Sequence, residues 1–171
     1  MSFGFLVAGF FATTNAGRVA LARETEQPAW RTVAAALLAG ASLVVLATLL
    51  ADDLLGALTI SPESFRIAAG FVLLVTAIRM LLWPAATTGP FGAVLVTPEL
   101  AVIALSFGGD EPTGKVLGAA AITLPLLLIA AMTLPWLRGR LPLTSSATAQ
   151  LLAALQIVVA VALAISGMRD V

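Results

Sequence analysis

Two residue types that soluble enzymes use heavily are missing from this sequence. None of its 171 residues is cysteine and none is histidine. The absence of cysteine excludes disulfides, thiolate nucleophiles and thiolate-bound metal clusters. The absence of histidine removes the commonest metal ligand and the usual acid–base shuttle of catalysis. We therefore expect no enzymatic activity and no bound cofactor or metal.

Charged residues are also scarce. Asp, Glu, Lys and Arg make up 11% of the chain, whereas hydrophobic residues make up 60%, and the mean hydropathy is +1.07. Soluble domains are about one quarter charged, so this chain has too few charges to cover a water-facing surface. Nine basic and nine acidic residues cancel, which gives no basic patch for nucleic acid. The composition predicts an integral membrane protein whose first partner is the lipid bilayer.

Six apolar stretches approach the length of a membrane-spanning helix, which is about 20 residues. A bilayer offers no partners to backbone polar groups, so the crossings should be α-helices, and the runs are too uniform for barrel strands. The first run lacks the basic segment of a signal peptide and is expected to be retained. The sequence predicts one all-α transmembrane domain over residues 1–171, with six helices at 3–20, 32–51, 64–83, 90–108, 116–137 and 147–167.

The distribution of basic residues predicts the orientation of the chain. Cytoplasmic connectors are usually richer in arginine and lysine than the outer ones. This rule places connectors 1, 3 and 5 in the cytoplasm and both termini on the outer side. The basic residues on the two sides are Arg18, Arg23, Arg31, Arg79, Arg138 and Arg140, against Arg66, Lys115 and Arg169.

An internal repeat relates the two halves of the chain. A displacement of 83 residues aligns the third apolar run with the sixth and matches Val33 with Val116. With three crossings in each half, residues 1–83 and residues 88–171 enter the membrane from opposite faces. This is the 3+3 inverted repeat of many secondary transporters, whose sites lie at the midplane between the halves.

An acidic residue interrupts the fourth apolar run. Glu99 follows Thr97 and Pro98 in the middle of this run. A carboxylate at the bilayer centre costs about 2.5–3.5 kcal/mol on insertion scales, so Glu99 should face the bundle interior, find a partner or be protonated. Pro98 removes one helix hydrogen bond. We expect an interrupted helix 4 with an ion or proton site at the break; the alternative is a neutral carboxyl group bonded to nearby backbone.

Polar residues interrupt the first run at the equivalent depth. Thr13, Thr14 and Asn15 are expected to line a polar cavity at an interrupted helix 1. Arg18 either pairs with Glu99 or extends to the membrane surface. Gln156 lies at the middle of the sixth run and completes the predicted site, whose residues are Glu99, Pro98, Thr97, Asn15, Thr13, Thr14, Gln156 and Arg18.

Small and aromatic residues predict packing and anchoring. Gly114 and Gly118 form a GxxxG pattern, which typically lets two membrane helices touch. Trp83 falls at the predicted cytoplasmic end of the third helix. Tryptophan is common there because its ring suits the membrane interface.

One segment carries a family resemblance. The run Leu58-Thr59-Ile60-Ser61-Pro62-Glu63-Ser64-Phe65-Arg66-Ile67-Ala68-Ala69-Gly70, which continues to Leu81, resembles the MarC family of six-span inner-membrane proteins, within the LysE-like transporter group. The family's first span typically carries Asn-Pro-x-Gly, of which Asn15 and Gly17 are present here. Its fourth span carries Gly-Pro-Gly, and Thr97-Pro98-Glu99 stands at that place. The resemblance implies a bacterial inner-membrane protein with transporter-like architecture.

Two classes of function remain open. The first is a transporter of a small solute or ion, with Glu99 coupling a proton or cation to substrate movement at the midplane. The second is a non-transporting structural or assembly subunit of a larger membrane complex. The expected protein partner is accordingly a second copy, as a homodimer, or other membrane-protein subunits. An intramembrane enzyme is disfavoured because only one acidic residue lies deep within an apolar run.

Overall fold

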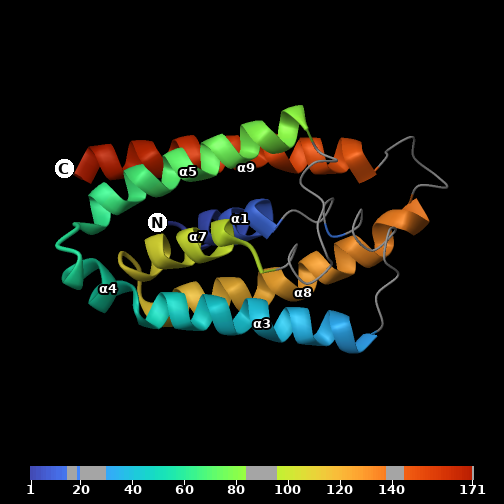
Figure 1. Ribbon diagram of the computed structural model, residues 1–171, viewed down its shortest axis with the longest axis horizontal. Coiled ribbons are helices and arrows are strands. Elements are labelled where there is room, and N and C mark those ends of the chain that lie inside the picture. The colour runs from blue at the N-terminus through green and yellow to red at the C-terminus, as the bar shows by residue number, and fades with distance from the viewer. Residues whose placement is uncertain (15–18, 20–29, 84–95, 138–144, 171) are drawn as a thin grey trace.

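The computed structural model describes residues 1–14, 19, 30–83, 96–137 and 145–170. All regular structure within these ranges is α-helical, as predicted from the apolar runs. The helices are α1 (Phe3–Thr14), α3 (Trp30–Leu49), α4 (Ala51–Ala57), α5 (Pro62–Leu82), α7 (Pro98–Gly108), α8 (Thr113–Leu137) and α9 (Ser145–Asp170) (Figure 1).

Three of these helices are long and apolar enough to cross a membrane. They cover Trp30–Leu49, Pro62–Leu82 and Ala147–Arg169. The chain is therefore consistent with a membrane protein, whereas six crossings remain a prediction. In the predicted helices 3–20 and 90–108, the described helical parts are α1 and α7, which are apolar but short.

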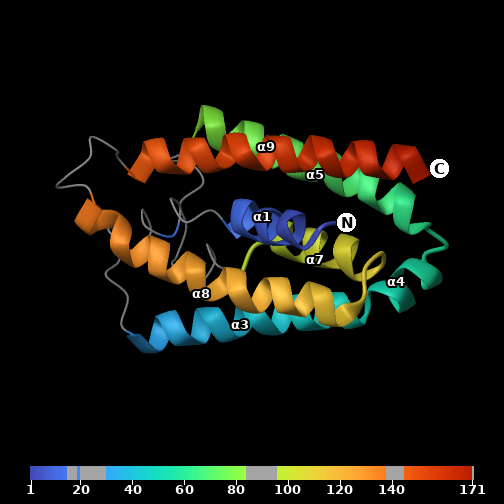
Figure 2. The ribbon, with the colours of Figure 1, turned by 180° about the vertical axis from the view of Figure 1, so that it is seen from behind.

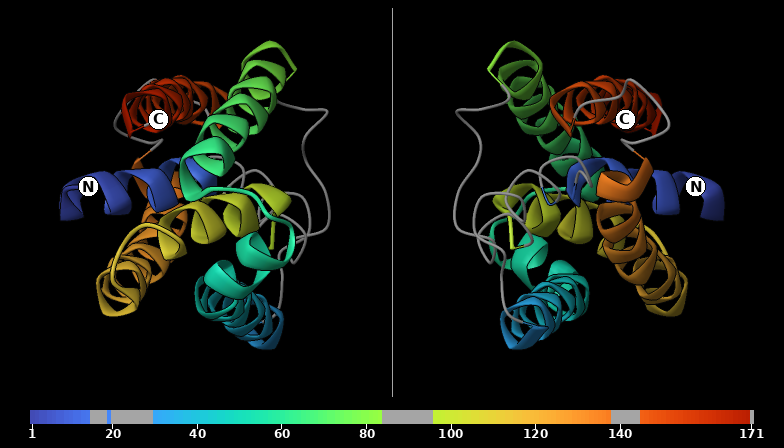
Figure 3. Two further views of the ribbon diagram at one scale, coloured as in Figure 1. Left: turned by 90° about the vertical axis from the view of Figure 1, so that its left-hand side faces the viewer. Right: turned by 90° about the vertical axis from the view of Figure 1, so that its right-hand side faces the viewer.

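The helices form three layers (Figures 1 and 2). The long helices α5 and α9 pair on one side, and α3 and α8 lie on the other. Between these pairs, α1 packs against α8 and α9, and α7 packs against α3 and α5. Figure 3 shows the same arrangement along the bundle, with α1 and α7 in the interior layer. The outer helices cover α7 and the last turns of α1, whereas the first residues of α1 reach the edge of the bundle, where Phe3 is exposed (Figure 3).

The pair α5–α9 is held by glycines that let the two backbones touch. A Cβ atom on Gly70 would lie 2.7 Å from the carbonyl oxygen of Ala160, and one on Gly167 would lie 2.7 Å from that of Glu63. These contacts run in opposite directions along the two helices, so α5 and α9 are antiparallel. Backbone contact at small residues is how membrane helices associate without a hydrophobic driving force.

The predicted GxxxG contact is wrong. A Cβ atom on Gly114 would meet nothing within 4 Å, and one on Gly118 would lie 3.9 Å from a ring atom of Phe3. These distances show open space or ordinary van der Waals contact. The pattern failed because the face of α8 that carries these glycines is not pressed against another helix backbone.

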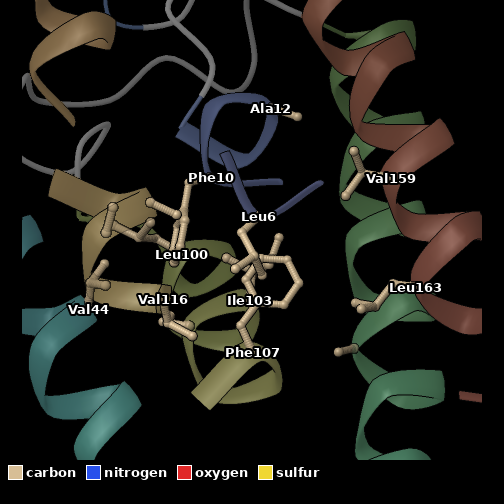
Figure 4. Close-up of a cluster of buried hydrophobic side chains, with 14 of the residues drawn as sticks. Leu6, Phe10, Ala12, Val44, Leu100, Ile103, Phe107, Val116, Val159 and Leu163 are labelled. Carbon is tan, nitrogen blue, oxygen red and sulfur yellow. The ribbon is translucent and has the colours of Figure 1, made fainter. Parts of the chain in front are cut away.

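The core lies where the interior layer meets the outer pairs (Figure 4). The side chains of Leu6 and Phe10 on α1 interdigitate with Ile103 and Phe107 on α7, and all four are buried. The rings of Phe10 and Phe107 meet edge to face at a centroid distance of 5.6 Å, a preferred aromatic geometry. Large apolar side chains on α3, α5 and α9 point outward, as helices surrounded by lipid require.

One end of the bundle holds Met1, the residues that precede α5, the 109–112 connector and the end of α9. The amino group of Met1 contacts Glu111, and Gly167 lies against Glu63. We call this the terminal end. Trp83, 60% exposed, caps the opposite end of α5, where an interfacial anchor is expected. Which end faces the cytoplasm remains a prediction.

The α5–α9 contact predicts a sharp difference between two glycine-to-alanine substitutions. Gly70→Ala should destabilise the protein by about 1–3 kcal/mol, because the new methyl group meets backbone atoms that cannot move aside. Gly118→Ala is the matched control and should be neutral or stabilising by up to about 1 kcal/mol, since alanine is the better helix former. The free energy of unfolding in mixed micelles measures both. Equal effects would contradict close packing at Gly70.

Candidate functional site

Two short helical segments, α1 and α7, meet at the middle of the bundle. At 1.5 Å per residue α1 is about 18 Å long and α7 about 17 Å, whereas α9 is about 39 Å. Both short helices lie in the half nearer the terminal end (Figures 1 and 2). A Cβ atom on Gly9 would meet Ile103 and Phe107, and the ring of Phe5 also faces Phe107. The last turn of α1 is therefore level with the first turn of α7.

Thr97 caps the beginning of α7. Its backbone is extended, with φ −104° and ψ 149°, and its hydroxyl oxygen accepts a hydrogen bond from the backbone N–H of Leu100. The N···O distance is 3.3 Å. A side-chain oxygen at this position satisfies a backbone donor that has no partner within the helix. Thr97 is buried, so the cap is made inside the protein.

Pro98 begins α7 and does not break it, which corrects the prediction that it removes a hydrogen bond inside helix 4. The first position of a helix needs no backbone donor, and the proline ring already has a helical φ. The same start occurs at Ser61-Pro62-Glu63, where the Ser61 hydroxyl oxygen caps α5. The repeated Ser/Thr-Pro-Glu pattern was the sequence signal for both helix starts.

Glu99 therefore lies in the first turn of α7, not within an uninterrupted helix. Its side chain is partly buried, and its Oε2 atom has neither solvent contact nor a hydrogen-bond partner among the residues that the structure describes. The alternative prediction was a neutral carboxyl group that is hydrogen-bonded to nearby backbone. The Oε2 atom of Glu99 makes no such bond to the described residues. The N-terminal end of a helix favours negative charge because its N–H dipoles point toward it. Glu99 thus has a compensating dipole and an oxygen available to a ligand.

Thr13 and Thr14 are buried at the end of α1. The Thr13 hydroxyl donates to the carbonyl oxygen of Gly9 at 2.9 Å, and the Thr14 hydroxyl donates to that of Phe10. Such bonds to the preceding turn satisfy the hydroxyl hydrogen and leave the oxygen as an acceptor. Both residues therefore present acceptor oxygens at the depth where α7 begins.

Gln156 is buried halfway along α9. Its Nε2 atom donates to the carbonyl oxygen of Leu73 on α5 at 3.4 Å, whereas its Oε1 atom is buried without a partner. The amide thus joins α5 to α9, as polar side chains often join membrane helices. It also contributes a second acceptor that is not satisfied.

The structure brings part of the predicted site to one level of the bundle. Thr13 and Thr14 end α1 where Thr97, Pro98 and Glu99 begin α7, and Gln156 lies on a helix that packs against α1. Asn15 and Arg18 lie outside the described residues, so the pairing of Arg18 with Glu99 remains a prediction.

The side-chain groups available to a ligand where α1 and α7 meet are oxygen atoms, and one of these groups is acidic. No cluster of three or more potential metal-ligating side chains occurs in the described ranges. An apolar groove of about 370 Å³ between α3 and α8 has no predicted site residue among its lining residues, which are Leu37, Leu38, Ala41, Ala121, Leu124, Pro125 and Ile129. A hydrocarbon chain suits this groove better than a polar solute.

Sequence reasoning missed one buried charge. Arg66, counted as an outer surface residue, is 2% exposed and forms an ion pair with Asp110. The signal was its helical spacing, because Ala69, Gly70 and Leu73 follow at three, four and seven positions and lie on the same buried face.

Comparisons with protein families, curated proteins and solved structures find no match, and the resemblance of residues 58–81 to the MarC family stays a prediction.

The capping role of Thr97 is testable by substitution. Thr97→Ala should lower the free energy of unfolding by up to about 1 kcal/mol, because the N–H of Leu100 loses the hydroxyl oxygen and keeps only the backbone carbonyl oxygen of Thr97 as its acceptor. Thr97→Ser keeps the oxygen and should retain most of the stability. Detergent unfolding of the three proteins measures the difference, and a serine variant as unstable as the alanine variant would argue against the cap.

Proposed function

We propose that this chain is a membrane transporter for a small solute or ion, with its site between the end of α1 and the beginning of α7. The observation that carries the proposal is the Oε2 atom of Glu99, which is buried without a partner at mid-bundle. Acidic groups at such a depth are costly and typically mark ion or proton paths. Gln156 supplies a second buried acceptor, Oε1, which has no partner among the described residues and lies on α9, a helix that packs against α1.

The positions of the helices support a 3+3 inverted repeat. The displacement of 83 residues that aligns the sequence with itself carries α3 onto α8 and α5 onto α9.

The packing of the helices also supports this symmetry. The hydrogen bond from Gln156 to Leu73 joins residues 83 apart on the equivalent helices α9 and α5. Inverted repeats of this kind hold substrate where interrupted helices from the two halves meet.

The proposed chemistry is neutralisation of one buried charge. A proton or a monovalent cation at Glu99 removes the negative charge, and the dipole of α7 compensates this charge when the site is empty. Gln156 Oε1 and the threonine hydroxyl oxygens complete a set of oxygen ligands. One carboxylate suits a singly charged cation better than a divalent one, which usually takes several acidic ligands.

We place the protein in the bacterial inner membrane with both termini on the outer side. The excess of arginine at the opposite side supports this orientation, and the outward-facing apolar side chains supply the contact with lipid. The proposal agrees with the transporter-like architecture that the MarC resemblance implies.

Glu99→Gln tests the proposal in purified protein reconstituted into liposomes. Flux is followed with a trapped pH-sensitive dye and, separately, with a trapped sodium-sensitive dye. Wild-type protein should give flux above that of protein-free liposomes, and Glu99→Gln should abolish it, because glutamine keeps the shape and removes the charge. Glu63→Gln is the matched control, since Glu63 holds the same position after Ser61-Pro62 at the start of α5.

Flux that is unchanged in a folded Glu99→Gln variant would remove this residue from the mechanism. Wild-type liposomes without flux of either ion, together with fixed-stoichiometry copurification of unrelated membrane proteins, would favour the structural-subunit alternative. Equal loss in both glutamine variants would indicate a general electrostatic effect.

A further inference from the structure

We infer that the 109–112 connector and its ion pairs form a gate that closes the proposed site on the side of the terminal end. This inference rests on the proposed transport function. The connector joins α7 to α8 and lies one short helix away from Glu99. Three groups of observations carry it: the ion pairs, the apolar layer beneath them and the buried hydroxyl groups nearby.

The first ion pair joins the connector to α5. The Nη1 atom of Arg66 lies 3.1 Å from Oδ2 of Asp110, and the two side chains are 3% and 25% exposed. Burying an arginine is costly unless an opposite charge faces it. The carboxylate of Asp110 therefore compensates the positive charge of an arginine that is buried away from water.

Further contacts join the same connector to three other helices. Glu111 pairs with Lys115 on α8 at 2.6 Å and with the amino group of Met1, which precedes α1. A Cβ atom on Gly109 would lie 2.7 Å from Leu55 on α4. The four residues of the connector thus contact α4, α8 and the residue that precedes α1 at the terminal end.

An apolar layer lies beneath the connector. The rings of Phe5 and Phe10 both meet the ring of Phe107 edge to face, at centroid distances of 6.1 Å and 5.6 Å. Ile103 fills the space against Gly9. This layer lies between the terminal end and the level of Glu99, so a polar solute has no path through it in this conformation.

Two buried hydroxyl groups near the connector would gain hydrogen-bond partners if the connector moved away. Thr48 Oγ1 and Ser106 Oγ lack partners. The backbone of Thr48 touches Gly108, the last residue of α7, and Ser106 is in the same turn. Buried polar groups without partners are rare and costly. Water admitted when the connector moves away would satisfy both.

The contacts differ in how easily they can separate. The connector is held by side chains, whereas α5 and α9 are interlocked through backbone contacts at Gly70 and Gly167. Side-chain ion pairs can break and re-form without unfolding a helix. Opening therefore requires motion of the 109–112 connector, while the backbone contacts of α5 with α9, and of Gly108 with Thr48, stay intact.

The absence of native cysteine allows a direct accessibility test. Ser106→Cys is a near-isosteric buried reporter, and its reaction with a membrane-impermeant maleimide measures the open fraction. Gly56→Cys, on the exposed α4, identifies the side from which the terminal end is reached. Adding Asp110→Asn to the Ser106→Cys reporter should raise its labelling rate from that side about tenfold or more, since about 1.4 kcal/mol of lost closure energy suffices.

Asp53→Asn is the matched control, because Asp53 is exposed at the same end of the bundle. It should leave the labelling rate unchanged. Glu111→Gln removes the second pair and should also raise the rate, which provides a test if Asp110→Asn fails to fold. Unchanged labelling in the folded variants, or equal labelling in the control, overturns the gate.

The outcome separates the gate from the proposed transport. Glu99→Gln tests flux and should not raise the labelling of Ser106→Cys. Flux in the wild type without a labelling response to the connector variants overturns the gate alone. A labelling response without flux of either ion overturns transport and, with it, the function of the gate.

Discussion

Hydrocarbon offers no hydrogen-bond partner, and this constraint governs how the two short helices of the interior layer can end. Every helix terminus leaves backbone donors or acceptors without a partner in its own turn. Here α7 begins inside the bundle, between two pairs of longer helices. The Thr97 cap satisfies one donor of α7. The outer helices keep lipid away from the remaining groups, so the polar helix ends are tolerated only because the layers surround them.

The same constraint divides the molecule into parts of different rigidity. Between α5 and α9 the contact is made by backbone atoms at Gly70 and Gly167, so neither helix can slide without a clash. At the end of α7, Gly108 likewise meets the backbone of Thr48, whereas the 109–112 connector that follows is held by ionic side chains. Packed side chains can exchange one arrangement for another, whereas interlocked backbones cannot. The connector is therefore the part of the terminal end best suited to move.

Composition and the lengths of the apolar runs predicted the helical class and most helix positions, because an apolar run of about 20 residues is what a membrane-crossing helix requires. The run predicted at 64–83 is α5, from Pro62 to Leu82. The depth of Glu99 was harder to predict. Hydropathy averages over a whole run, so it did not separate a mid-helix acid from one that follows a cap and a proline. The local chemistry of Thr97 decides between them.

Packing between helices was the least predictable part. Gly114 and Gly118 carry the familiar spacing and face no backbone, whereas Gly70 and Gly167 lie in different helices and make the closest contacts. A spacing rule within one helix cannot identify which face meets a neighbour. Arg66 shows the same limit, since its burial depends on Asp110, 44 residues away in the chain.

A single rigid helix connects the two functional hypotheses. Glu99 is in the first turn of α7 and Asp110 follows its last turn, so about 17 Å of helix separates a buried acid from an ion pair. If opening at Asp110 shifts α7, it changes the surroundings of Glu99 and hence its affinity for a cation. Thermodynamic linkage then requires that a cation at Glu99 bias the opening equilibrium by the same factor. One carboxylate at the inner end of a short helix and one ion pair at its outer end are sufficient for coupled binding and access.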